Sequence, residues 1–283
     1  MSPPKEVDLI PEEQAILREW RELFVEHYNE DIKGLQGHHD NVYGFEVDHL
    51  LIDQKDRLRL DFHTMPTRVL ELGTRVLREQ FEHHLVQMRP VIRVVGFPEN
   101  YLRSVDSLRM RDRSSLVSLN VKINDVSPAY GWLKTTVYEC RGCGTRIEVE
   151  QRRARERESP GPCRICIQKL IEDGKEEEIT RRLFADFTEY KFLQEECNYE
   201  DLQDVSMSQV AYNSDLHVLN CSTKVQIVGT VVDDLVGDVE PQSYARVNGI
   251  VRVQPIPDRT FAKDTRRTLS LDVLSVEPLA LHE

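Results

Sequence analysis

The sequence lacks the glycine-rich signatures of the common nucleotide-binding folds. No G-x-x-x-x-G-K-[ST] phosphate loop occurs in its 283 residues, and no Rossmann glycine fingerprint follows a strand-like segment. No Ser/His/Asp or Cys/His arrangement indicates a nucleophile that the sequence alone could support. We therefore expect this chain to bind no ATP through a phosphate loop and to have no enzymatic activity of its own.

Long apolar runs and an excess of positive charge are also missing. No stretch approaches the roughly 18 apolar residues that cross a bilayer, and the N-terminus lacks the apolar core of a signal peptide. The chain has 37 Lys and Arg against 49 Asp and Glu, so its net charge is -12. Such acidity argues against a protein that coats nucleic acid with its whole surface, although a local basic element stays open. We expect an intracellular protein with no membrane partner.

Cysteine is scarce, and four of the six cysteines form two tight pairs. Cys140-x2-Cys143 is followed, after nineteen residues, by Cys163-x2-Cys166, a spacing typical of a four-thiolate zinc site. Two such pairs close a tetrahedron that leaves no position for water, so the metal should hold structure and not catalyse. The pattern predicts one structural Zn2+ per chain. Disulfides and an iron-sulfur cluster are the alternatives, and they suit an intracellular chain with this spacing less well.

Apolar periodicity predicts a helical subdomain in residues 1–90. One helix begins near Pro11, and a second begins at Pro66 and ends before Pro90. Between them we expect a short apolar patch at residues 45–52 and then a turn-rich stretch. The first helix carries one apolar stripe, made by Ile16, Trp20, Leu23 and Phe24.

Beyond residue 90 the sequence changes to short β-branched and alternating runs that are typical of strands. Because no helical period of the parallel-sheet type separates these runs, we expect a small β-barrel. Its two parts are residues 91–139 and 183–283, and the cysteine-bearing residues 140–182 form an insert between them. The fold class is multi-domain α+β, with a helical bundle and a barrel that carries a zinc module. The expected strands are residues 91–95, 116–123, 132–138, 187–193, 224–232, 245–253 and 269–276.

The last two expected strands flank a polar loop, residues 254–268, and together predict a basic hairpin. The loop locally reverses the acidity of the chain and can contact phosphates. Lys122 and Lys134 on neighbouring strands extend this candidate DNA-binding surface. A solvated hairpin with incidental charge is the alternative. The basic residues of the hairpin are Arg259, Lys263, Arg266 and Arg267, with Phe261 among them.

Taken in order, the helical subdomain, the barrel with its four-cysteine insert and the basic hairpin resemble a known arrangement. It is the N-terminal region of archaeal-type minichromosome maintenance (MCM) replicative DNA helicases, without the AAA+ ATPase domain. The resemblance spans most of the chain. Its best local pieces are FEVDHLLIDQKDRL, MPTRVLELGTRVL, TTVYECRGCG, FTEYKFLQEE, VVDDLVGDVEP and ARVNGIVRV.

The resemblance implies an oligonucleotide/oligosaccharide-binding (OB) fold for the barrel, and a homo-oligomer that encircles DNA in replication. In the family this is a hexamer, a double hexamer joined through the zinc modules, or a filament. The implied ligand is single-stranded DNA, with double strands left open. By resemblance Arg259, Lys263, Arg266 and Arg267 occupy the DNA-contacting stretch, whereas Lys122 and Lys134 lie only near the barrel positions that bind single strands.

The resemblance also bears on the whole protein. If the full-length protein carries the C-terminal half of the family, it is an ATP-dependent DNA helicase. The expected location is the cytoplasm or nucleoid of an archaeon, or the nucleus of a eukaryote.

The chain departs from the family in three places. Pro241-Gln242-Ser243 replaces a Pro-Gly-Asp turn, and residues 124–131 form a less basic first barrel hairpin. Residues 195–226, a loop that communicates with the ATPase in the family, are long and lack its Pro/Gly-rich form. Other hypotheses are a replication-protein-A-like single-strand binder, a zinc-bearing ligase or transferase, and a zinc-stapled scaffold. The helical subdomain counts against the first, and the missing nucleotide motif counts against the second.

Overall fold

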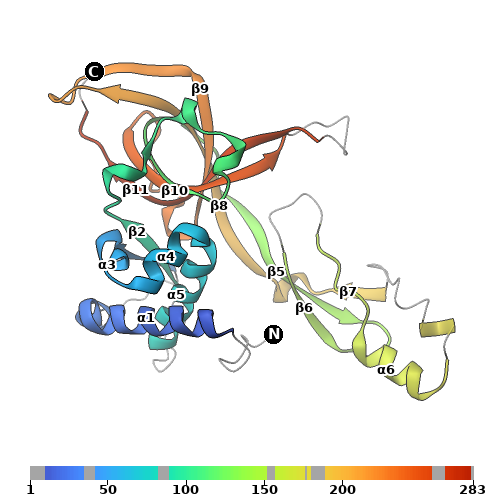
Figure 1. Ribbon diagram of the computed structural model, residues 1–283. Coiled ribbons are helices and arrows are strands. Elements are labelled where there is room, and N and C mark those ends of the chain that lie inside the picture. Colours follow the sequence, from blue (N-terminus) through green and yellow to red (C-terminus); the bar gives the residue numbers. More distant parts are fainter. Residues whose placement is uncertain are drawn as a thin grey trace. The chain divides into compact units, whose positions relative to one another are not determined.

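The computed structural model describes residues 10–34, 42–81, 89–151, 157–175, 177–179, 189–256 and 265–281. They form two compact units, and the chain passes between these units after Ala129 and after Asp201. Residues 130–201 form the unit that we call the cysteine unit. The residues before and after them form the barrel unit, which contains helices and a β-barrel (Figure 1). No helix in the described parts is long and apolar enough to cross a membrane.

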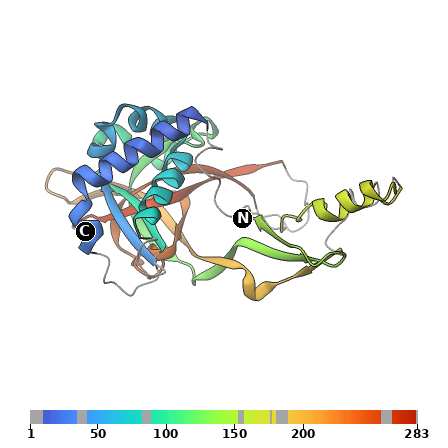
Figure 2. The ribbon, with the colours of Figure 1, turned by 90° about the horizontal axis from the view of Figure 1, so that it is seen from below.

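Both predicted long helices are present in the barrel unit. Helix α1 (Pro11–His27) starts at the predicted proline and buries Ile16, Leu17, Trp20, Leu23 and Phe24, while α5 (Pro66–Phe81) starts at the other predicted proline. The two helices pack side by side in both views (Figures 1 and 2). Their contact is close because Gly73 has no side chain, and a Cβ there would lie 2.5 Å from the Trp20 ring. The indole Nε1 of Trp20 also donates to the Val69 carbonyl at 3.0 Å.

The stretch between these helices is more ordered than the sequence predicts. It contains α2 (Asn29–Gly34), strand β1 (Val42–Asp48), α3 (His49–Asp53) and α4 (Asp56–Thr64). The expected turn-rich stretch is therefore wrong, because Leu58, Asp61 and Phe62 lie one helical turn apart and bury one face of α4. Helix α3 begins with a side-chain cap, since the Asp48 carboxylate accepts the Leu50 N–H at 2.8 Å.

Strand β1 pairs in parallel with β2 (Arg89–Val95), with Val47 opposite Val94. Residues 91–95 do form a strand, but this strand belongs to a two-stranded sheet and not to the barrel. Ile92 and Val94 are buried in the same core as Trp20 and Phe24. The sequence alone misassigned β2 because its partner strand lies far away in the chain, among residues read only as an apolar patch.

Five strands close the barrel: β4 (Leu116–Val126), β8 (Asn198–Tyr212), β9 (Val218–Val232), β10 (Tyr244–Pro255) and β11 (Arg267–Pro278). Their order is β4-β10-β11-β9-β8, and β8 pairs with β4 to close the ring. All pairs are antiparallel except β9 and β11, which run parallel. This closed, OB-like barrel and the helices before it confirm the predicted α+β class. The barrel core includes Leu119, Val121, Val205, Met207, Val247 and Leu271.

Residues 195–226 are not a loop. Strand β8 pairs with β9 from Leu202 opposite Val232 to Tyr212 opposite Val218. Its buried residues, Leu202, Val205, Met207 and Val210, are separated by polar residues. That polar content made the segment resemble a loop, although one face of the strand packs into the barrel.

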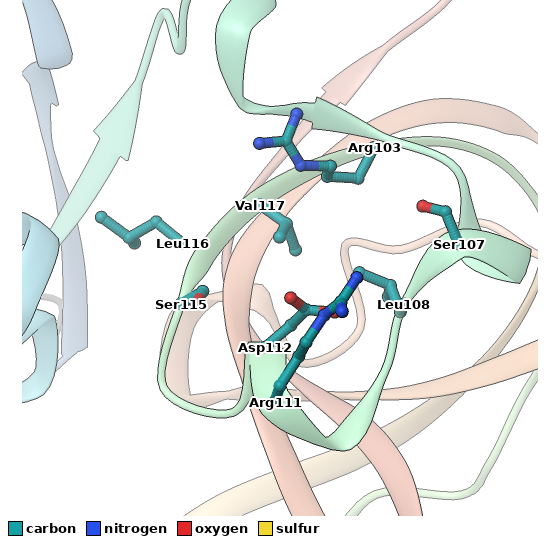
Figure 3. A pocket seen from close by; sticks show the side chains of 8 residues that line it. All are labelled: Arg103, Ser107, Leu108, Arg111, Asp112, Ser115, Leu116 and Val117. Atoms are coloured by element: carbon teal, nitrogen blue, oxygen red, sulfur yellow. The ribbon is translucent and has the colours of Figure 1, made fainter.

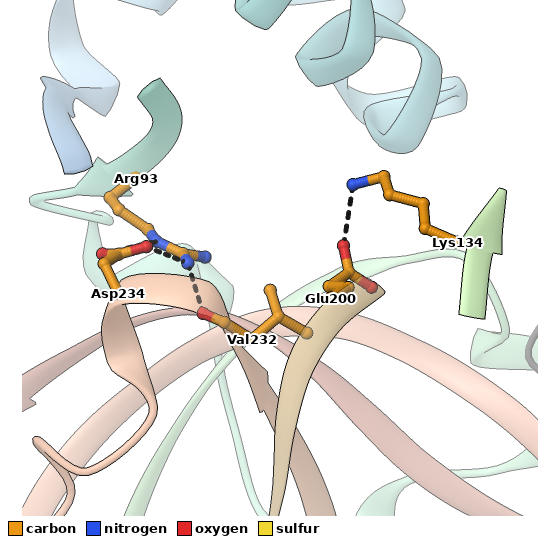
Figure 4. A network of polar contacts seen from close by, with 5 residues as sticks. All are labelled: Arg93, Lys134, Glu200, Val232 and Asp234. Atoms are coloured by element: carbon orange, nitrogen blue, oxygen red, sulfur yellow. Dashed lines mark hydrogen bonds and ion pairs between the residues drawn. The ribbon is translucent and has the colours of Figure 1, made fainter. Parts of the chain in front are cut away.

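A buried arginine ties the helical part of this unit to the barrel. Arg93 of β2 is only 4% exposed; its Nη2 donates to the Val232 carbonyl at 2.7 Å, and its Nε lies 3.1 Å from the Asp234 carboxylate (Figure 4). Asp234 lies on the short helix η8 (Asp233–Leu235), directly after β9. A second hydrogen bond joins β2 to the barrel, because the Ser275 hydroxyl of β11 donates to the Val94 carbonyl at 2.6 Å.

The cysteine unit contains the antiparallel strands β5 (Tyr130–Cys140), β6 (Arg146–Glu150) and β7 (Tyr190–Phe192), the helix α6 (Arg164–Glu172) and the short helix η7 (Gln194–Glu196). It is wider than the predicted insert, residues 140–182, because β5 and the first residues of β8 belong to it. The limits of the helical subdomain, barrel and insert remain a prediction.

Candidate metal centre and nucleic-acid interface

The structure brings the four predicted metal ligands together. The sulfur atoms of Cys140, Cys143, Cys163 and Cys166 all lie within 4.8 Å of one another. Cys140 Sγ is 3.6 Å from Cys166 Sγ, and Cys143 Sγ is 3.5 Å from Cys163 Sγ. These distances are far longer than the roughly 2.05 Å of a disulfide bond, so the predicted alternative of disulfides does not describe this cluster.

Local structure aims each cysteine pair at the centre. Cys140 ends β5, and the chain turns back through Gly144, whose φ of 73° is a left-handed conformation that glycine adopts without strain. The Gly144 N–H donates to the Cys140 carbonyl at 2.8 Å, which holds this turn closed. Cys163 occupies the N-cap position of α6, although its side chain makes no cap hydrogen bond, and Cys166 lies in the first turn, where free backbone N–H groups favour thiolates.

The sulfur atoms fit a tetrahedral metal ion. Four thiolates at the Zn–S distance of about 2.3 Å would be about 3.8 Å apart, close to the measured distances. Burial raises the pKa of Cys143, but hydrogen bonds with Thr145, Cys166 and Cys163 outweigh it and lower the pKa to about 6. Burial raises the pKa of Cys163, and it raises that of Cys166 to about 12. Cys143 is thus ready to bind as a thiolate, whereas metal binding must displace protons from Cys163 and Cys166.

Few apolar residues support this cluster. Besides the cysteines, the core cluster at this site contains only two buried residues among those described, Tyr138 and Tyr190, with Ile147, Val149 and Phe192 packed against it. The Tyr190 hydroxyl donates to the Gly161 carbonyl at 2.5 Å, just before the second cysteine pair. Such a small core gives little stability by itself, so a bound ion would supply a large share of it.

The predicted basic hairpin is formed by β10 and β11. Their pairing runs from Ala245 opposite Pro278 to Pro255 opposite Arg267, so the tip of the hairpin begins after Pro255. Arg266, directly before β11, and Arg267, the first residue of β11, are both exposed. Arg259 and Lys263 lie outside the described residues.

The two predicted lysines have different surroundings. Lys122 of β4 lies opposite Tyr244 of β10, and its Nζ is 5.4 Å from the centre of the Tyr244 ring. Lys134 of β5 belongs to the cysteine unit and forms a 2.9 Å ion pair with Glu200 (Figure 4). This carboxylate competes with any phosphate for Lys134, which weakens Lys134 as a phosphate contact.

Comparison with known proteins supports the arrangement as a whole. No family model and no curated protein matches the sequence. Among solved structures, the chain is similar to the N-terminal domain of an archaeal MCM, with a TM-score of 0.71 over 94% of this chain and 99% of that one. The chain has the fold of an MCM N-terminal domain. The sequence identity is 17%, so this likeness shows the fold alone.

Within this MCM fold, one face of the barrel carries polar residues that sequence reasoning missed. Asn120 lies opposite Arg246 in the pairing of β4 with β10, next to the pair of Lys122 and Tyr244. The Asn120 amide donates to the Tyr212 hydroxyl at 3.4 Å. Basic and aromatic side chains side by side can hold phosphates and stack on bases. The alternation of polar and apolar residues in the sequence could have identified this face, since these residues of β4 and β10 are separated by buried Val121 and Ala245.

Proposed function

We propose that this chain is the DNA-binding and ring-assembly region of an MCM-type replicative helicase. The observation that carries the proposal is the likeness to an archaeal MCM N-terminal domain along nearly all of both chains. The likeness includes the helices, the barrel and the cysteine unit, not the barrel alone. That extent favours this function over a replication-protein-A-like binder, for which an OB barrel with a zinc module would suffice.

In this proposal the four cysteines hold one Zn2+ per chain, which stabilises the cysteine unit and does no chemistry. Four buried or half-buried thiolates leave no open position at the metal for water or substrate. The thiolate set suits zinc better than magnesium or calcium, which prefer oxygen ligands. The zinc-bearing unit would then serve contacts between rings.

DNA would be held mainly through its phosphates, with little reading of bases. The proposed contacts are Arg266 and Arg267 at the hairpin, together with Arg259, Lys263 and Lys122. Lys134, paired with Glu200, contributes less. Each chain is acidic overall, with a net charge of -12, so one chain alone should bind weakly. A ring of six or more hairpins around one strand would act as a multivalent site and supply the missing affinity.

The proposal extends to the whole protein only through the family. Attached to the ATPase half of an MCM helicase, this region would guide single-stranded DNA, or a duplex, through the ring. Without that half it has no motor.

A fluorescence anisotropy titration tests DNA binding. The zinc-loaded protein is mixed with labelled single-stranded DNA at two salt concentrations, and Arg266→Ala/Arg267→Ala is measured beside the wild type. We expect salt-sensitive binding by the wild type, together with weaker binding and a flatter salt dependence for the variant. Replacing Arg18 and Arg59, two exposed arginines on the helices, removes the same charge and serves as the control.

Three results would count against the proposal or its mechanism. A wild-type protein that binds no DNA at low salt would contradict the function itself. A hairpin variant that titrates like the control would remove the hairpin from the DNA-binding surface. Tight binding by a monomer would favour the replication-protein-A-like alternative.

A further inference from the structure

Four arginines in one short segment lack carboxylate partners. They are Arg103, Arg109, Arg111 and Arg113, and among the described residues none of them forms an ion pair. Within the described part of the chain, the side chains of Arg103 and Arg109 donate to backbone carbonyls only, and the Arg111 side chain makes no hydrogen bond. Elsewhere in the same unit, carboxylates neutralise most arginines, including Arg21, Arg57, Arg68, Arg75, Arg93, Arg246 and Arg252.

This pattern is unexpected in a chain that has more acidic than basic residues. Residues 103–113 carry four arginines and two aspartates, a local charge of +2 in a chain of net charge -12. The carboxylates of Asp106 and Asp112 are engaged by other groups: Asp106 accepts from the Ser104 hydroxyl, and Asp112 accepts the Arg109 N–H at 2.7 Å. The positive charge of the segment therefore stays available to an external anion.

The segment is fixed to the barrel and presents its arginines on a firm support. It contains β3 (Leu102–Arg103), the short helices η4 (Val105–Ser107) and η5 (Met110–Asp112), and the turn that leads into β4. Val105 and Leu108 are buried in the barrel core. Ser114 N–H donates to the Val251 carbonyl at 2.8 Å, which ties the end of the segment to β10.

A cavity of about 380 Å³ opens beside this segment. Arg103 lies on one side of it and Arg111 on the other, with the Ser107 hydroxyl at its rim (Figure 3). Leu108 and Leu116 give part of the lining an apolar character. Asp112 also lines the cavity, so the charged lining is two arginines against one aspartate. The volume exceeds that of a phosphate group and has room for an attached sugar.

We propose that this cavity binds a phosphate of a nucleic-acid strand, through the guanidinium groups of Arg103 and Arg111. Arginine suits this role because its planar fork of donors matches phosphate oxygens. Arg109 and Arg113 flank the cavity along the same segment, which suits a polyanion better than a single small anion. The proposal rests on the proposed DNA-binding function and adds a contact separate from the β10–β11 hairpin.

The test compares Arg103→Gln/Arg111→Gln with the wild type in binding to fluorescein-labelled oligothymidylate. For single strands each lost phosphate contact lowers the slope of log affinity against log salt by about 0.7, so the double variant, which removes the one proposed contact, should lose about 0.7. The ratio of wild-type affinity to variant affinity should then change about 2.6-fold between 50 and 200 mM salt. The single variant Arg111→Lys keeps the charge at this position. Compared with the double glutamine variant, it should recover part of the salt slope but less of the affinity.

Arg18→Gln/Arg59→Gln is the matched control, because it removes the same charge from exposed positions on the helices. Equal melting temperatures for both double variants establish that the fold is intact. If the wild type binds and the cavity variant behaves like the control, the cavity site is wrong while the proposed function stands. If the wild type binds no DNA, both are wrong.

A second arm distinguishes a strand from a free nucleotide. Thymidine monophosphate is titrated into the wild type and the cavity variant, and heat of binding is measured. Weak or absent binding in both, together with the loss of oligonucleotide slope, supports a strand phosphate. Saturable nucleotide binding that the cavity variant loses, with unchanged oligonucleotide binding, would overturn the proposal in favour of a free nucleotide site.

Discussion

The two compact units of this chain are stabilised in different ways. The barrel unit buries two extensive apolar cores, one around Trp20 and Phe24 and one inside the barrel around Leu119 and Met207. The core cluster of the cysteine unit contains two tyrosines and three of the four clustered cysteines. The first unit can fold through apolar burial, whereas the second depends on four sulfur atoms that repel or protonate unless a cation joins them.

This difference between the two units indicates which surfaces can change without loss of the fold. A unit held by a metal ion can change its surface freely, because few of its side chains are needed for packing. The barrel unit has less freedom, since many residues of β4, β8, β10 and β11 are buried. Its candidate ligand groups accordingly lie on the outward residues of strands and on the connections between them.

The largest effect should come from removing one metal ligand. Cys163→Ser should abolish metal binding and unfold the cysteine unit, because structural zinc contributes roughly 10–16 kcal/mol of apparent binding free energy in small zinc modules. The barrel unit should keep its fold, since its cores contain none of the four cysteines. Hydrogen exchange measured by mass spectrometry locates the loss: rapid exchange confined to residues 130–201 is expected. Uniform exchange along the chain would contradict the separation of the two units.

The reverse result is expected for a change in the apolar core of the barrel unit. Trp20→Ala should destabilise that unit by about 3–5 kcal/mol, because it leaves a large cavity against α5 and removes the hydrogen bond to Val69. The zinc content, measured by mass spectrometry of the native protein, should stay at one ion per chain. Zinc loss in parallel with unfolding of α1 would show that the units do not fold separately.

A somewhat smaller effect is expected at the buried ion pair between the helical part and the barrel. Arg93→Ala leaves the Asp234 carboxylate, 18% exposed, without its partner, and should cost about 3 kcal/mol. Urea unfolding followed by tryptophan fluorescence measures this change. Arg93→Ala/Asp234→Ala should recover part of the loss, because the unpaired charge is then gone. No recovery would mean that packing of the arginine, not its charge, matters.

Acid should weaken the barrel unit through one buried histidine. His49 is 1% exposed, and its Nε2 lies 3.1 Å from the Tyr101 hydroxyl. Burial lowers the pKa of His49 below its usual 6.5, the nearby His63 lowers it further, and Asp53 and Asp48 partly offset these effects. The unfolded chain therefore binds the proton more tightly, so stability is full above pH 6.5 and falls as the pH drops below it.

Urea unfolding at several pH values between 7.5 and 5 measures the slope of the unfolding free energy against pH. His49→Gln can still accept from Tyr101 and should flatten the slope, whereas His63→Gln is the control that should leave most of it. An unchanged slope in His49→Gln would assign the acid sensitivity to other groups.

The smallest effect is expected on the surface of the cysteine unit. Lys134→Ala removes an ion pair with Glu200 in which the lysine is 48% exposed, and such pairs contribute about 0–1 kcal/mol. We expect little change in zinc affinity, measured by competition with a chelator, and little change in DNA affinity. A large loss of DNA binding would restore Lys134 to the DNA-binding surface.

Local features were predicted well from the sequence. The four-cysteine cluster depends on two short cysteine pairs, and α1 and α5 each begin at a proline followed by one apolar stripe, so neighbouring residues contain the needed information. Strand β8 was missed because its polar residues conceal the buried ones. Strand β2 was misplaced because its pairing with β1 joins distant segments. The arginine cavity needed tertiary structure, since only the folded chain shows which arginines lack carboxylate partners.

The central claim, that this chain forms the ring-assembling region of an MCM-type helicase, is tested most directly by its mass in solution. Multi-angle light scattering of the zinc-loaded chain with single-stranded DNA should find six chains of 32.9 kDa, about 197 kDa, or a larger assembly. Cys163→Ser should shift the distribution away from double rings. A mass of 32.9 kDa at every concentration, with zinc and DNA present, would contradict the account.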